Sequence, residues 1–276
     1  MNSFKTTNYA GRTIYYGLGF IWLLWAALVA LAGSWQLGLA TALVFGFGLL
    51  DDLFGASSSK GFKGHLTALG RGTITTGLIK LIGISAVSFW YALQEGLTKI
   101  QGGGELAQSW YDPRRLAIAC LAGAAIALTS NFFNLVDLRP GRAAKIYLFF
   151  ATITAVVVVL ATWFMGFNAS ELGLSTLQES LGYVGHPYLV TIIPIVLILI
   201  PDLREKAMLG DAGANAAGFV LGAFIVLWLG WVGIALYTLI MLALNLASEK
   251  VSFSHVIENN PLLKKLDNIG RLNSGE

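Results

Sequence analysis

Long apolar runs alternate with short polar segments along the whole chain. A helix needs roughly 20 apolar residues to cross a hydrocarbon layer about 30 Å thick, and most of these runs reach or approach that length. The runs 36–50 and 187–200 are shorter, so these helices are expected to tilt little, to thin the bilayer or to extend into the polar segments. We expect about eight transmembrane helices, over residues 14–32, 36–50, 74–93, 116–130, 143–167, 187–200, 212–229 and 231–247.

Only Gly230 separates the last two runs. This spacing fits either a tight outer turn between two helices or one long kinked helix, which would place the C-terminus outside. We expect the turn. The predicted fold is then an all-α polytopic membrane bundle over residues 1–250, followed by a cytoplasmic amphipathic tail over residues 251–276.

The tail carries the signals of a short helix. Asn260 followed by Pro261 is typical of an N-cap and a first helical residue, and Gly270 is typical of a helix end. We expect this helix to lie on the inner membrane surface, because its apolar residues form one stripe. The stripe consists of Leu262, Leu263, Leu266 and Ile269.

Composition agrees with a membrane protein, because 56% of the residues are apolar and only 12% are charged, which excludes a soluble domain. Lys and Arg near span ends are retained on the cytoplasmic side. With the N-terminus inside, the outer segments hold only Lys99, Arg114 and Arg115. This bias predicts a multi-pass protein of the plasma membrane. It also accounts for the net charge of +3, which therefore gives no reason to expect nucleic acid as a partner. The oligomeric state stays open, a homodimer included.

The few carboxylates of the spans fall at the ends of apolar runs, all on the predicted cytoplasmic face. Asp51 and Asp52 end their run, where the negative end of the helix dipole disfavours a carboxylate, so a structural role is a poor explanation. Two adjacent acids can share a divalent cation, or one can hold the metal while the other accepts a proton. The alternative is a solvated helix end.

Asp211 precedes an apolar run and is equally well explained as a plain N-cap. The small residues around it leave room for phosphate oxygens at a helix N-terminus. Asn131, Asn134 and Asp137 are spaced at i, i+3 and i+6, so a continuous helix places them roughly on one face. Basic residues follow this segment. The alternative to a functional site is that the asparagines cap a helix end and the basic residues belong to an ordinary inner loop. These cations include Arg139 and Arg142.

The segment after Asp52 carries Lys60, Lys63 and His65, which suit a diphosphate group but are also expected as topology markers or loop hydrogen-bonders. Lys80 is different, because it lies about two turns inside an apolar run. A charge there is costly unless the side chain reaches the surface or faces a polar cavity. We expect Lys80 to face a cavity.

Together these segments resemble, in order and spacing, the polyprenyl-phosphate N-acetylhexosamine-1-phosphate transferase family, which includes phospho-N-acetylmuramoyl-pentapeptide transferase. The family is a bundle of about ten helices with a cytoplasmic active site, and this chain corresponds to it from the second helix onward. The matching segments are Leu49-Leu50-Asp51-Asp52-Leu53, Asn131-x-x-Asn134-Leu135-Val136-Asp137 and Leu209-Gly210-Asp211-Ala212-Gly213.

The resemblance implies a Mg²⁺-dependent enzyme that moves a sugar phosphate from a nucleotide-sugar to a polyprenyl phosphate. It assigns Asp211, with Asp51 or Asp52, to the metal, and gives the other paired acid the role of orienting or deprotonating the lipid phosphate. Asp137 joins the catalytic group. The implied substrate contacts are Lys60, Lys63, His65, Lys80, Asn131, Asn134, Arg139 and Arg142.

Two departures from the family pattern matter. Pro140 stands where the family usually has a second aspartate, and residues 201–205 replace its usual approach to the last motif. A non-catalytic member that binds lipid phosphate, or a partner in cell-envelope assembly, is therefore the alternative to a transferase. A transporter fits less well, because the acids gather at one face and not at the midplane.

Overall fold

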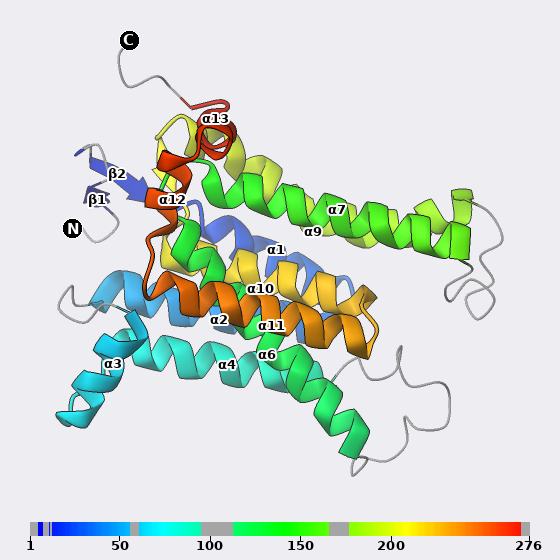
Figure 1. The fold of residues 1–276 in the computed structure, drawn as a ribbon, viewed down its shortest axis with the longest axis horizontal. Helices are drawn as coiled ribbons and strands as arrows, with labels where there is room; N and C mark the ends of the chain where they lie inside the picture. The colour runs from blue at the N-terminus through cyan, green and yellow to red at the C-terminus, as the bar shows by residue number, and fades with distance from the viewer. Residues whose placement is uncertain are drawn as a thin grey trace.

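The computed structural model describes residues 5–7, 11, 13–55, 61–94, 113–165 and 177–271. In this part of the chain helices dominate, beside one small three-stranded sheet. The long helices lie side by side, and the N-terminal strands and the last two short helices gather at one end of them (Figure 1). We call this end the strand end and the opposite one the far end.

Within the described residues, seven helices are long and apolar enough to cross a membrane. An eighth apolar helix, α1 (Phe20–Leu31), has only 12 residues. The protein is therefore a membrane-embedded all-α bundle, as predicted. The seven are α2 (Trp35–Phe54), α4 (Thr76–Gln94), α6 (Pro113–Val136), α7 (Arg142–Met165), α9 (Leu177–Leu203), α10 (Gly210–Trp228) and α11 (Trp231–Ser248).

The predicted first span, residues 14–32, is wrong in its first part. Strand β2 (Thr13–Tyr16) pairs antiparallel with β1 (Lys5–Thr7) and parallel with β3 (Ala207–Met208). Its β-branched and aromatic residues favour a strand, and the glycines after it separate strand from helix. Apolarity alone did not distinguish this strand from the helix that follows.

The two shorter runs extend into the polar segments, which is one of the outcomes expected for them. Helix α2 continues past the predicted end at residue 50 through both aspartates to Phe54. Helix α9 contains Pro187, Pro194 and Pro201 within its 27 residues. Polar residues and prolines thus marked the ends of the apolar runs but not the ends of the helices.

Helix α10 is the buried centre of the bundle and packs on α2 and α6. Glycines allow the close approach at both contacts. A Cβ at Gly48 of α2 would lie 2.6 Å from Ala212 Cα, and one at Gly218 of α10 would lie 2.7 Å from Ser130 Cα. The first turn of α10 is thereby pressed against the end of α2 that carries the two aspartates.

This packing makes a testable difference between two glycines of α2. Gly48→Ala is expected to lower the free energy of unfolding by about 1–3 kcal/mol, because the added methyl group meets backbone of α10. Gly46→Ala is the control: its Cβ meets nothing within 4 Å, so the variant should be neutral or slightly stabilising. Thermal unfolding in detergent measures both, and equal effects would contradict the close contact.

The chain turns back between the last two spans, as predicted. Helix α11 runs back along the bundle in the direction opposite to α10 (Figure 1), and both pack on α6. The tail then forms α12 (Phe253–Asn259), which was not predicted, and α13 (Pro261–Asn268). The predicted N-cap is confirmed, because the Asn260 side chain accepts the backbone N–H groups of Leu262 and Leu263, each at 3.1 Å.

Helix α13 runs across the direction of the spans, so that Figure 1 shows it end-on beside α7 and α9. Its apolar stripe is largely exposed, from 39% for Leu263 to 67% for Leu262. This arrangement is that of a helix lying along a membrane surface. The contact with the inner leaflet stays a prediction.

Candidate functional site

Three segments far apart in the sequence meet at the strand end around one lysine. Lys80, in the second turn of α4, places Nζ 2.6 Å from Asp51 Oδ2 in the last turns of α2. The same Nζ donates to Asp211 Oδ2, also at 2.6 Å, in the first turn of α10. The ammonium group therefore bridges two carboxylates from two different helices.

The bridge is largely shielded from solvent. The side chains of Lys80 and Asp51 are only 10% and 16% exposed, while Asp211 is more open at 37%. Thr76, one turn before Lys80 on α4, donates its hydroxyl to Asp51 Oδ1 at 2.6 Å. A buried charge is tolerated when it is paired and hydrogen-bonded, so Lys80 faces this cluster and not lipid.

Asp52 plays a different part from its neighbour. Its two carboxylate oxygens accept the backbone N–H groups of Asp211 and Ala212, each at 2.9 Å. A helix N-terminus leaves such N–H groups free and carries partial positive charge, so Asp52 caps α10 from another helix. Gly210 makes room for this, with a φ of +68° and a Cβ position only 3.0 Å from Asp52 Oδ2.

A small cavity of about 150 Å³ adjoins the cluster between α4, α6 and α10, and its lining includes apolar residues and Glu249. Lys80, Asn131, Asn134 and Asn215 line it. Asn131 and Asn215 donate their amides within the protein, to Asn245 Oδ1 at 2.6 Å and to the Asp211 carbonyl at 2.7 Å. The side-chain oxygen Oδ1 of Asn134 is buried without a hydrogen-bond partner, which is costly unless a ligand or water donates to it.

Asp137 follows the last residue of α6, outside the spans. Burial raises the pKa of its carboxyl well above the ordinary value, and the carboxylate of Asp202 raises it further. Asp211 and Asp52 add to the rise, whereas the guanidinium of Arg142 opposes it. The carboxyl of Asp137 therefore keeps its proton to a higher pH than an ordinary aspartate.

A pH dependence follows from this raised pKa. An unfolded aspartate loses its proton near pH 4, whereas folded Asp137 keeps it to higher pH. The folded state then binds more protons than the unfolded state, so this group makes stability fall as the pH rises above about 4. Asp137→Asn, which is always neutral, should raise the thermal unfolding midpoint at pH 8 and change it little at pH 4. A pH-independent effect would contradict the raised pKa.

The two arginines expected at the substrate bind the tail instead. Arg142, 2% exposed, donates Nε and Nη2 to the two carboxylate oxygens of Asp267, both at 2.9 Å, and Nη1 to Ser254 Oγ at 2.8 Å. Arg139 pairs with Glu258 at 2.6 Å. These contacts fix α12 and α13 to the junction of α6 and α7.

The electrostatics of Asp267 agree with this docking. Its burial would raise the pKa, but hydrogen bonds and attraction from Arg142, with help from Arg271 and Lys145, hold the pKa of this carboxyl below its ordinary value. Asp267 was not among the residues predicted from the sequence. The only signal for it was an acid on a tail helix whose other charges are Lys264 and Lys265.

The predicted substrate contacts in the segment after Asp52 lie outside what the structure describes. Lys60 lies outside the described residues, and so do the side chains of Lys63 and His65, whose backbone belongs to α3 (Gly61–Gly70). Of the predicted residues, the structure brings together Asp51, Lys80, Asp211 and Asp52, with Asn131 and Asn134 in the adjoining cavity.

Carboxylates are the ligands that Mg²⁺ prefers, so the chemistry of Asp51 and Asp211 suits it. In the part of the chain that the structure describes, no group of three or more His, Cys, Asp or Glu side chains is arranged to hold a metal ion. The place between the two carboxylates is taken by Lys80 Nζ. A cation can approach Asp211 from its exposed side, where the carboxylate is open.

Comparison with known proteins gives no match: no family model, no curated protein and no solved structure matches this chain. The function is therefore argued from the site alone, with the resemblance of its motifs as an expectation.

Proposed function

We propose that this protein is a membrane-embedded transferase that moves a sugar phosphate from a nucleotide-sugar to a polyprenyl phosphate at its strand end. The observation that carries the proposal is the convergence of Asp51, Lys80 and Asp211 from three distant segments, beside a cavity with a buried free acceptor on Asn134. A paired cation and anions beside a cavity inside a membrane protein are typical of a functional site.

The reaction is a displacement at phosphorus. An oxygen of the lipid phosphate attacks the sugar-linked phosphorus of the donor, the bond to the bridging oxygen of its diphosphate breaks, and a nucleoside monophosphate leaves. The product is a lipid-linked sugar diphosphate. Such reactions depend mainly on positioning and on offsetting negative charge.

Residues of the cluster have distinct parts in this scheme. Lys80 offsets the charge of the transferred phosphate, and Asn134 accepts a hydrogen bond from the substrate. Asp52 is a positioning residue, because its contacts with backbone N–H groups fix the turn that carries Asp211. Mg²⁺, held by Asp211 with Asp51, would supply further neutralisation of phosphate charge.

The test uses the full chain in nanodiscs with polyprenyl phosphate, Mg²⁺ and a panel of nucleotide-sugars. Release of a nucleoside monophosphate that requires both the lipid phosphate and one donor is the expected result. Mg²⁺-dependent thermal stabilisation by the same donor would identify the nucleotide. If no donor in the panel yields nucleotide under these conditions, the transferase proposal fails.

A second candidate is a non-catalytic protein that binds a lipid phosphate. It is favoured by one observation: Lys80 Nζ lies between the two carboxylates that would share a metal. Binding of polyprenyl phosphate that is unaffected by Mg²⁺, together with no release of nucleotide, would favour this candidate over the transferase.

A further inference from the structure

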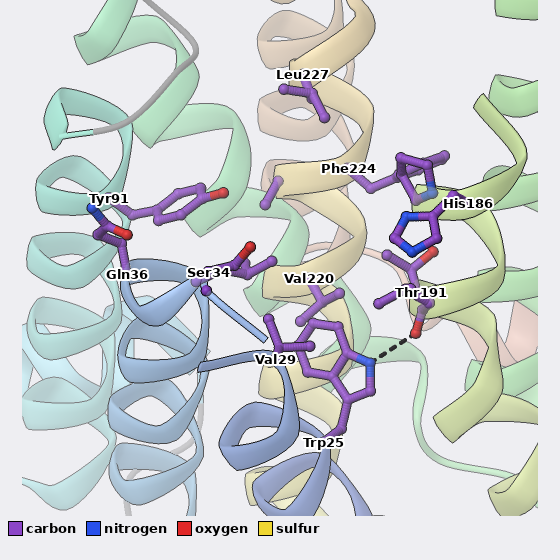
Figure 2. Close-up of a pocket in the computed structure, with 15 residues that line it drawn as sticks. Trp25, Val29, Ser34, Gln36, Tyr91, His186, Thr191, Val220, Phe224 and Leu227 are labelled. Carbon is purple, nitrogen blue, oxygen red and sulfur yellow. Dashed lines mark hydrogen bonds between the residues drawn. The ribbon is translucent and has the colours of Figure 1, made fainter. Parts of the chain in front are cut away.

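A second cavity, of about 340 Å³, lies toward the far end of the bundle. Residues of α1, α2, α4, α9 and α10 line it. Figure 2 shows Gln36 and Tyr91 on one side, His186 and Thr191 on the other, and Trp25 beneath them. The cavity is separate from the carboxylate cluster, because it lies beside the later turns of α10 and the cluster lies at its first turn.

The short helix α1 accounts for the space. Helix α1 starts beside the first turn of α10, because a Cβ at Gly19 would lie 2.8 Å from the backbone N of Gly213. At 1.5 Å per residue, the 12 residues of α1 span roughly 18 Å and the 19 residues of α10 roughly 28 Å. Because Gly213 lies three residues into α10, its contact with Gly19 leaves the elbow between α1 and α2 roughly 5 Å short of the far end of α10.

This elbow directly precedes the first residue of α2, a helix long enough to cross a membrane. Gly33, with a φ of +104°, and Ser34 form the elbow, and both line the cavity. Irregular backbone within a membrane is tolerated only where protein covers it or where it borders a polar space. The backbone N–H groups of Gly33 and Ser34 are satisfied within the protein, by the carbonyls of Ala30 at 3.2 Å and Val29 at 3.1 Å, so the elbow adds the Ser34 side chain to the polar part of the lining.

The opposite wall is held in place by a specific bond. Pro194 of α9 has no N–H group, which leaves the carbonyl of Val190, four residues earlier, without its helical partner. The indole N–H of Trp25 donates to this carbonyl at 2.7 Å, as the dashed line in Figure 2 shows. Helices α1 and α9 are thereby tied together at the floor of the cavity.

The lining has no fixed charge, because none of the described residues that form it is Asp, Glu, Lys or Arg. This chemistry is unsuited to a nucleotide or a metal ion. Ser34, Gln36 and Tyr91 are polar residues of the lining, whereas Val220, Phe224 and Leu227 of α10 form an apolar wall. A fitting ligand is therefore amphipathic and carries no net charge.

We propose that this cavity binds one zwitterionic phospholipid of the leaflet opposite the carboxylate cluster, with its headgroup over the elbow and one acyl chain along α10. Two observations favour a lipid over other amphipathic molecules. His186 both lines the cavity and is exposed, so the cavity opens beside it. The outer face of α9 next to this opening is apolar and exposed, at Leu189 (56%) and Ile193 (54%), so membrane lipid adjoins it.

Native mass spectrometry of the full chain, titrated with phosphatidylethanolamine, tests the proposal. One lipid should be retained per chain, and Ala223→Phe should weaken its binding at least tenfold, because Ala223 is 5% exposed and lines the cavity. Leu239→Phe adds the same ring on a 61% exposed position of α11 and should leave binding unchanged. Phosphatidylglycerol, which is anionic, should bind more weakly.

A second measurement needs no variant and so does not depend on the folding of Ala223→Phe. Photoactivatable phosphatidylethanolamine in vesicles should attach to the peptides around Gln36 and His186 in preference to the lipid-facing residues of α11. Even attachment to all exposed spans, no retained lipid, equal retention by both variants or a phosphatidylglycerol preference would overturn the proposal. This test involves no nucleotide-sugar, so its outcome is independent of the proposed function.

Discussion

Asp211→Asn is expected to reduce nucleotide release by at least about a hundredfold, because it removes the one cluster carboxylate that is both paired with Lys80 and open to a ligand. The substitution keeps the shape of the side chain. It also keeps the backbone N–H that Asp52 accepts, so the cap on α10 survives. Lys80 keeps its pair with Asp51, so the thermal unfolding midpoint should fall only modestly, while the rate of nucleoside monophosphate release falls far more.

The control for this variant is Glu258→Gln, which removes a carboxylate at the same end of the bundle. Glu258 pairs with Arg139 and its side chain is 50% exposed, so the substitution should change the rate less than about twofold. Equal rates for the parent and Asp211→Asn would contradict a role for Asp211 in the reaction. Equal losses in both variants would indicate a general effect of charge at this end.

The parts of the fold that depend on the local sequence alone were predictable. Apolar length predicted the bundle, and the sequence Asn260-Pro261 predicted the start of α13. Strand β2 was missed because it directly precedes the apolar run of α1 and its parallel partner β3 lies in a distant segment. Pairing between distant segments leaves little trace in a local hydrophobic pattern.

The same limit applies to the site. Lys80 was recognisable because a cation inside an apolar run needs a polar partner wherever that partner lies. The cap by Asp52 was not, because the N–H groups it accepts are 159 and 160 residues away. From the sequence, Asp52 could be weighed only against the dipole of its own helix, which disfavours it. The dipole that it stabilises belongs to α10.

Arg139, which follows α6, and Arg142, which begins α7, could not be told apart from the sequence either. Inner-loop cations look alike whether they bind a phosphate or a carboxylate of the same chain. Burial separates them in the structure. Arg142 is enclosed by the tail, while the partner of Arg139 is half exposed. Their substitutions should therefore differ greatly in effect.

Arg142→Met is expected to release α12 and α13 from the bundle, because it leaves the buried carboxylate of Asp267 without its two-bond partner. Breaking a buried pair costs about 3–5 kcal/mol, and Arg271, at 2.8 Å from Asp267, retains part of it. A local loss of about 2 kcal/mol corresponds to roughly thirtyfold faster amide hydrogen exchange in the tail helices.

Hydrogen exchange of residues 253–268 in nanodiscs measures this loss, and two variants make it specific. Arg139→Met should change tail exchange by less than about fivefold, because an exposed pair contributes up to about 1 kcal/mol. Arg142→Lys keeps the charge but cannot form the two parallel bonds, so it should lie between the parent and Arg142→Met. If Arg142→Met exchanged no faster than Arg139→Met, the tail would be held by its apolar contacts and not by the Arg142–Asp267 pair.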